Sequence, residues 1–324
     1  MSLSTRAVAV GVGLVVLAGC GASHPSTAPV AKAPQSATAK PTTLKVSVAP
    51  WHLPYAIARE AAIPIGAGKV IVGGGMFPDD TSSARAYTLT LASGQATMLP
   101  SLTVDVHDVA GGLYGGEPAI FGGGNASEQS TVQQFHAGSW RVIDHMPTTR
   151  SDLSVATVGS TTYVLGGYDG SGVPTQVLAQ RGPGLRPAGH LVEGVRYAAS
   201  AVLGSSIYLF GGEVSGAELT AVQRYDTVTH RTSVVARLPM PLGHASAAVL
   251  EGRILLMGGR VSPDHGTRAM WWFDPATAKF TRAGSLPLPV TDAAIAVSAD
   301  GLTAWLLGGE APTVRDGVIK LSLS

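Results

Sequence analysis

A short apolar run that ends in two glycines occurs six times along the chain at nearly constant spacing. The first glycines of successive pairs are 49, 44, 45, 47 and 50 residues apart. Periods of roughly 20 to 50 residues are typical of arrays of one structural unit, each of which buries its apolar face against the next. The six segments are residues 70–74, 119–123, 163–167, 208–212, 255–259 and 305–309.

Each unit predicts four short strands. A strand of small and apolar residues, as at 198–203 or 245–250, precedes the apolar run, which forms a second strand ending where the two glycines allow close backbone packing. A third strand, as at 222–226 or 271–275, leads through a turn to a fourth, which ends in Leu-Pro or Met-Pro in four of the units. No segment has sustained helical periodicity, so almost no helix is expected.

This pattern resembles the kelch repeat, in which Gly-Gly ends the second strand, an aromatic–Asp pair lies in the third and an aromatic residue opens the fourth, here Trp140 or Phe280. The resemblance covers about residues 42–324. It implies an all-β, six-bladed kelch-type β-propeller, with four-stranded blades around a channel. The third unit lacks the aromatic–Asp pair and the Leu-Pro, but its glycines and spacing indicate that it is also a blade.

The last unit predicts how the ring closes. Residues 318–322 form its third strand, and the sequence printed after them is too short for a fourth. Residues 44–48, followed by 51–54, have the character of a fourth strand and lie just before the first unit. We therefore expect this N-terminal strand to complete the last blade, which removes two exposed sheet edges.

The first twenty residues have the pattern of a bacterial export signal. Arg6 is followed by 13 apolar residues, 7–19, fewer than the roughly 20 needed to span a membrane as a helix but typical of a signal peptide. Residues 17–20 (LAGC) resemble a lipobox, which implies cleavage before Cys20 and a diacylglycerol on its sulfur. The alternatives are an uncleaved secretory signal or a chance LAGC.

Residues 20–41 are rich in Ala, Pro, Ser and Thr and nearly lack large apolar side chains. Such a segment cannot bury enough surface to fold, which predicts a disordered tether. The expected organisation is a lipoprotein signal peptide at 1–19, a lipidated Cys20 with its tether to 41, and a propeller at 42–324. The expected location is extracytoplasmic, on a bacterial cell membrane, with the bilayer as partner through Cys20.

Composition excludes several kinds of site. The net charge is only +1, from 22 basic and 21 acidic residues, so nucleic acid is not an expected partner. One cysteine excludes an internal disulfide, a thiolate zinc cluster and the Cys–Tyr crosslink of copper oxidases resembling galactose oxidase. With no HExxH or HxxxH pair, no metal and no cofactor are expected.

Two positions in each unit are expected to surround one mouth of the channel, because the loops that carry them emerge on the same face of an antiparallel blade. At the start of the first strand stand Arg59, His107, Arg150, Arg196, His244 and Asp292. After the glycine pair stand Gly75, Gly124, Tyr168, Glu213, Arg260 and Glu310. Such a ring suits a small polar or anionic ligand such as a sugar or carboxylate. Alternatively, its charges only form ion pairs between blades.

Propellers serve as enzymes and as binding scaffolds, so the fold alone does not choose between these functions. The sequence favours a membrane-anchored, extracytoplasmic lipoprotein whose propeller binds a protein or a glycan. The alternative is a carbohydrate-active enzyme resembling a sialic acid mutarotase. In that case Glu213 would act as the acid–base group and Arg196 would hold the substrate carboxylate.

Overall fold

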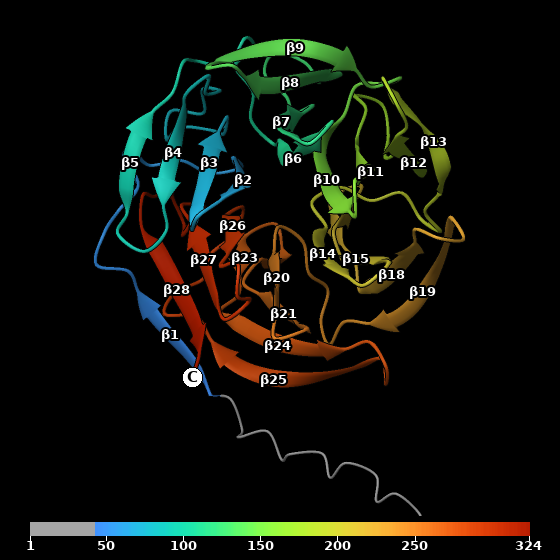
Figure 1. Cartoon of the computed structure of the whole chain (residues 1–324). Coiled ribbons are helices and arrows are strands. Elements are labelled where there is room, and N and C mark those ends of the chain that lie inside the picture. Colours follow the sequence, from blue (N-terminus) through green and yellow to red (C-terminus); the bar gives the residue numbers. More distant parts are fainter. Residues whose placement is uncertain (1–42) are drawn as a thin grey trace, which may run out of the picture. The chain divides into compact units, whose positions relative to one another are not determined.

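The computed structural model describes residues 43–324, and all regular structure in this part of the chain is β-strand. Six four-stranded antiparallel sheets surround a central axis as the blades of a propeller (Figure 1). This arrangement confirms the all-β, six-bladed prediction, including the third blade. The predicted signal peptide, lipobox and tether lie outside the described residues.

Blades 1 to 5 each run along the chain from the axis outward (Figure 1). Blade 1 contains β2 (Ala61–Gly66), β3 (Lys69–Gly73), β4 (Ala86–Thr90) and β5 (Gln95–Met98). Blade 2 contains β6 (Ala110–Tyr114), β7 (Glu117–Phe121), β8 (Thr131–His136) and β9 (Ser139–His145). Blade 3 contains β10 (Ser151–Val158), β11 (Thr161–Tyr168), β12 (Gln176–Gln180) and β13 (Leu185–His190).

Blades 4 and 5 each carry an extra two-stranded hairpin in the loop between their second and third strands. Blade 4 contains β14 (Ala199–Leu203), β15 (Ser206–Phe210), β18 (Ala221–Asp226) and β19 (Arg231–Arg237), with the hairpin β16 (Glu213–Val214) and β17 (Ala217–Glu218). Blade 5 contains β20 (Ser246–Leu250), β21 (Arg253–Met257), β24 (Ala269–Asp274) and β25 (Lys279–Ser285), with the hairpin β22 (Arg260–Ser262) and β23 (His265–Gly266).

Blade 6 joins the two ends of the described chain. It contains β26 (Ala294–Val297), β27 (Thr303–Leu307), β28 (Val318–Leu323) and, as its outermost strand, β1 (Leu44–Val48). The register of β1 against β28 runs from Leu44 opposite Leu323 to Val48 opposite Ile319. The predicted closure by the N-terminal strand is therefore confirmed.

The core is divided into six apolar layers, one between each pair of neighbouring blades. Between blades 6 and 1, for example, Val70 and Tyr87 pack with Trp305 and Leu307. Alternate residues of each strand therefore enter the two flanking layers, and both faces of every blade are buried. No blade can bury its apolar residues alone, which is why the repeats occur as a ring.

The glycine pairs join neighbouring blades through the main chain. The second glycine of each pair donates its N–H to a carbonyl that lies just before the next blade, as from Gly212 to Leu242 at 2.8 Å or from Gly309 to Ile57 at 2.9 Å. The first glycine has a positive φ and lies against that same carbonyl, so that a Cβ added at Gly211 would be 2.0 Å from the Leu242 oxygen. Close approach and positive φ together require glycine.

Blade 1 departs from the predicted register by one residue. Its structural pair is Gly74–Gly75, since Gly75 donates to the carbonyl of Val106, whereas the sequence pattern selected Gly73–Gly74. The cause is an irregularity between Pro64 and Gly66 in the hairpin of β2 and β3, which adds a residue before three successive glycines. Met76 therefore occupies the position after the pair, which had been assigned to Gly75.

Candidate functional site

Six residues with left-handed backbone conformations surround the axis at one face of the propeller. Their φ values lie between 53° and 60°, and they are Arg59, Asp108, Asp152, Tyr197, His244 and Asp292, one from each blade. Adjacent members are joined by main-chain hydrogen bonds of 2.9 to 3.0 Å in five cases, and Val109 N–H donates to the carbonyl of Arg59 in the sixth. A non-glycine residue at positive φ costs about 1–2 kcal/mol. That cost points to a role for these side chains.

The six residues and their C-terminal neighbours line a mouth cavity of about 130 Å³. The C-terminal neighbours also line the part of the central channel that adjoins this cavity, a space of about 190 Å³. The channel walls are mostly Ala, Ser and Gly, with few polar side chains apart from Glu60. The polar chemistry of the axis is therefore concentrated at the mouth.

The structure brings together most of the residues that the sequence selected. In three blades, however, the residue that lines the cavity is one or two positions after the selected one. Arg59, His244 and Asp292 line the mouth cavity. In blades 2, 3 and 4 the equivalent residues are Asp108, Asp152 and Tyr197, which the sequence analysis missed in favour of His107, Arg150 and Arg196. In blades 2 to 5 the cavity residue stands 14 positions before the first glycine of the pair. A search at fixed spacing, rather than for the nearest basic residue, finds all four.

Arg150 differs most from the expectation. Its side chain is fully buried, and its Nη1 donates to the carbonyls of Gly166 and Gln176 at 3.1 and 2.9 Å. Burial lowers its pKa to about 10. Arg150 therefore ties β11 to β12 inside blade 3 and does not face the mouth. Gly124, which was also expected there, pairs through its main chain with His107.

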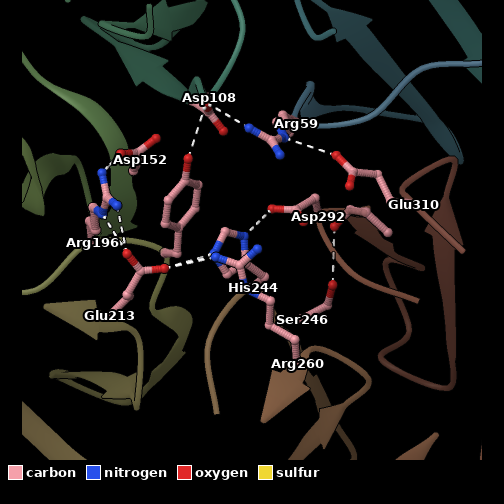
Figure 2. Close-up of polar contacts among 12 residues, drawn as sticks. Arg59, Asp108, Asp152, Arg196, Glu213, His244, Ser246, Arg260, Asp292 and Glu310 are labelled. Atoms are coloured by element: carbon pink, nitrogen blue, oxygen red, sulfur yellow. Dashed lines mark hydrogen bonds and ion pairs between the residues drawn. The ribbon is translucent and has the colours of Figure 1, made fainter. Parts of the chain in front are cut away.

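One half of the mouth is organised around Glu213 (Figure 2). Arg196 donates to its Oε1 at 2.6 Å, Arg260 donates to Oε2 at 2.8 Å, and His244 Nε2 lies 3.4 Å from Oε2. Burial would raise the pKa of Glu213, but the hydrogen bonds from Arg196 and Arg260 outweigh it and lower the pKa to about 2. Glu213 is therefore ionised and paired with two guanidinium groups, so in an acid–base role it would first have to accept a proton.

The remaining rim residues complete this half. Tyr168 lies with its ring centroid 5.3 Å from the guanidinium carbon of Arg196, and its hydroxyl donates to the carbonyl of Gly170 at 2.9 Å. Arg260 also donates to Glu218 at 3.2 Å. Both basic side chains of this half are therefore engaged by carboxylates.

The other half is organised around Arg59 (Figure 2). Its guanidinium donates to Glu310 at 3.0 Å and to Asp108 at 3.3 Å. Tyr197 links the halves, because its hydroxyl donates to Asp108 at 3.3 Å while its ring stacks on His244 at a centroid distance of 3.7 Å. His244 in turn lies 2.6 Å from Asp292 through Nδ1. Ion pairs between blades, the alternative reading of these charges, are therefore abundant.

Buried carboxyl groups are in excess over cations in this site. Burial and the charge of Asp108 raise the pKa of Asp152 to about 8, and burial also raises the pKa of Asp108 above its ordinary range. Asp292 behaves oppositely, because the hydrogen bond from His244 outweighs burial and lowers its pKa. Among residues 43–324, no group of three or more His, Asp or Glu side chains is placed to hold a metal ion.

Glu60 is a second unusual carboxyl, located where the mouth cavity meets the channel. Both side-chain oxygens are buried, and burial raises its pKa well above the ordinary value. The folded state therefore retains a proton that the unfolded state releases, so stability falls as pH rises above the unfolded pKa.

Glu60→Gln is expected to remove the loss of stability that burial of Glu60 causes at high pH. Each unit of pKa shift corresponds to about 1.4 kcal/mol, so at pH 8 the variant should melt at least about 3 °C above the wild type. At pH 4 the two melting temperatures should converge. Glu117→Gln, at an exposed position, is the control. A difference in melting temperature between the wild type and Glu60→Gln that does not change with pH would contradict this account of Glu60.

A larger groove opens beside the mouth, between the loops of blades 5 and 6. Its volume is about 490 Å³. Pro263, Pro289 and Pro312 contribute rigid apolar surface, while Arg260 and Glu310 stand where the groove meets the mouth. Its size is within the range of roughly 300–1,000 Å³ typical of small-molecule sites.

Comparisons with known proteins agree with this architecture. The family described as Kelch motif matches residues 241–287, which include most of blade 5. Kelch-like protein terF of Aspergillus terreus is 33% identical over 126 residues, 36% of this chain and 27% of that protein. Kelch-like protein 35 of Mus musculus is 27% identical over 155 residues, 46% of this chain and 26% of that protein. The chain thus spans about a quarter of the length of these curated relatives.

A solved structure shows the same fold. The structure of YjhT matches with a TM-score of 0.72 and covers 84% of this chain and 99% of that chain, at 16% sequence identity. At this identity the likeness concerns the fold alone. The motif match and the kelch-like relatives support the interpretation of the chain as a kelch-repeat protein, and its fold is a six-bladed β-propeller.

Proposed function

We propose that the chain is a membrane-anchored, extracytoplasmic binding module that holds a protein or glycan partner at the mouth face of its propeller. The observation that carries this proposal is the groove between blades 5 and 6. It is preformed by three prolines, so little conformational entropy is lost when a partner docks. Its polar end, at Arg260 and Glu310, joins the network of the mouth.

Site-directed crosslinking and a blocking variant test the position of the partner. A photoreactive residue at Pro312 should crosslink a cell-envelope protein or glycan, whereas one at Ala276, exposed in the turn between β24 and β25 at the opposite end of blade 5, should not. Asp264→Trp should fill the groove and lower the crosslinked yield at least about tenfold, as expected when a bulky side chain replaces a partner contact. Ala276→Trp is the matched control. Equal crosslinking from both faces would refute the groove as the docking site.

The anchor is proposed from the sequence of residues 1–20. In the described part of the chain, no helix has the length and apolar character to cross a bilayer. An acyl chain gains about 0.8 kcal/mol for each buried methylene, and two or more chains give stable anchoring.

Cys20→Ala should therefore release the protein from the membrane. In a bacterial host, the wild type should sediment with membranes and incorporate labelled palmitate. The variant should lose the label and fall at least about tenfold in the membrane fraction, because no acyl chain remains to partition into the bilayer. Membrane association that persists without the label would instead indicate an uncleaved apolar signal as the anchor.

A further inference from the structure

The mouth cavity contains acceptors that the protein itself does not satisfy. Among the described residues, Asp152 Oδ1 and Asp292 Oδ2 have no hydrogen-bond partner, although these side chains are only 3% and 5% exposed. Both residues line the cavity, on blades 3 and 6. A buried acceptor without a donor costs roughly 1–3 kcal/mol, and more when it is charged. Each of these carboxyl groups therefore keeps one buried oxygen that has no hydrogen-bond donor within the described residues.

The charges of the lining point to a cation. Four carboxyl groups line the cavity, those of Glu60, Asp108, Asp152 and Asp292, against one guanidinium, Arg59, and one imidazole, His244. Arg59 is itself engaged by Asp108 and Glu310. An anionic ligand would have to displace these pairs and approach the ionised carboxylate of Asp292. The sequence-based expectation of a small anionic ligand is therefore not favoured at the axis.

The size and the arrangement of the acceptors narrow the ligand class. A space of about 130 Å³ is well below the roughly 300 Å³ of sites for drug-sized molecules. The aspartates stand on blades 2, 3 and 6, on different sides of the axis (Figure 2). An ammonium group offers several N–H donors that point in different directions, and charge-assisted hydrogen bonds to carboxylates are stronger than neutral ones.

From this geometry we infer that the mouth cavity is a binding site for a small primary ammonium group, held by Asp152 and Asp292 with Asp108 beside them. The site is separate from the groove between blades 5 and 6 and does not depend on the partner proposed there. Arg59, Tyr197 and His244 fix the carboxylates in position through the contacts described above.

Protons compete with the ammonium group for this site. The groups that face Asp152 are Asp108 on blade 2 and Arg196 and Tyr197 on blade 4. The remaining titratable groups of the lining are Arg59, Glu60, His244 and Asp292. Since the pKa of Asp152 is raised to about 8, a bound cation must displace its proton near neutral pH. Affinity should therefore increase about tenfold or more between pH 6.5 and 9.

Calorimetric titration of the purified full-length chain with ethylammonium chloride tests the inference. We expect saturable binding that strengthens with pH, with proton release at pH 7.5 detected as a difference between buffers of unlike ionisation enthalpy. Tetramethylammonium, which has no N–H, and sodium at equal ionic strength should give no saturable signal. A lysine amide capped at its α-amine distinguishes a side-chain ammonium group from a free small amine. If both compounds bind, the natural ligand can be a lysine side chain or a small amine. If only ethylammonium binds, the natural ligand is a free small amine.

Asp152→Asn is the decisive variant, because Asn tolerates the left-handed backbone and cannot acquire the negative charge that a bound ammonium group needs. It should weaken ethylammonium binding at least tenfold and abolish the pH dependence. Asp80→Asn makes the same change at an exposed residue with φ of 62° and should bind as the wild type does. Absence of ethylammonium binding to the wild type at pH 9, equal binding of tetramethylammonium, or unaltered binding by a folded Asp152→Asn variant would overturn the inference. If the variant does not fold, absence of proton release in the wild type overturns it.

Discussion

A chain that lacks residues 42–50 is expected to melt at least about 10 °C below the full chain. The deletion removes β1, whose five residues pair with β28, and the flanking Thr43 and Ala49, which hydrogen-bond to Ser324 just after β28 and to Val318 in β28. At about 1 kcal/mol for each hydrogen bond, together with the packing of Leu44 and Val46 against the layer between blades 5 and 6, the loss is about 5 kcal/mol. For a chain of this size, each kcal/mol corresponds to about 2–4 °C.

Thermal unfolding followed by circular dichroism measures this effect. Deletion of nine residues from the Ala/Pro-rich segment before the propeller, 30–38, is the control for chain length and should leave the melting temperature unchanged. If the two deletions have equal effects, β1 does not contribute to closure. Aggregation of the β1-deleted chain on heating, while the full-length chain unfolds in one transition, would also agree with closure by β1. The deletion exposes the edge of β28, and exposed edges pair with other chains.

Gly211→Ala is expected to lower the free energy of unfolding by at least about 4 kcal/mol, among the largest effects of a single substitution. The added Cβ would lie 2.0 Å from the carbonyl oxygen of Leu242, which also accepts the N–H of Gly212. The clash therefore displaces the hydrogen bond that joins blades 4 and 5. Denaturant unfolding curves give the change in free energy.

Gly204→Ala separates the two causes. Gly204 has the same φ of 59° but has no atom within 4 Å of an added Cβ. Its free energy of unfolding should fall only by the cost of placing Ala in the left-handed backbone conformation, about 1–2 kcal/mol. The difference between the two variants then measures the close approach of the blades. If Gly204→Ala is as damaging as Gly211→Ala, backbone conformation alone explains the glycine pairs.

The fold could be predicted because the repeated feature is itself the contact between blades. A glycine pair is visible in the sequence, and each pair forms the same main-chain bond to the next blade. The strand at 44–48 could be predicted for a similar reason, since only one blade lacked an outer strand. The error in blade 1 arose where Gly73, Gly74 and Gly75 are adjacent, because spacing cannot tell which two of three glycines meet the neighbouring blade.

The site could be predicted only in part, because the residue that faces the axis is selected by backbone conformation. Nearby positions differ in direction: Arg150 is buried inside blade 3, while Asp152, two residues later, lines the cavity and has a positive φ. Charge drew attention to Arg150 and Arg196, but the left-handed position is marked by its spacing from the glycine pair and not by residue type, since Arg, Tyr and Asp all occupy it. The partners of Glu213 come from blades 4 and 5 and depend on how the ring closes.

The hydrogen-bonded ring of left-handed residues at the mouth has a consequence for how such a protein changes over time. The bonds that hold these six positions in place come almost entirely from the main chain, so the frame does not depend on which side chains they carry. Asp, Asn, His and Gly all accept this backbone at modest cost. A lineage can thus acquire a different ligand preference through single substitutions at six fixed places without changing the main-chain frame that holds them.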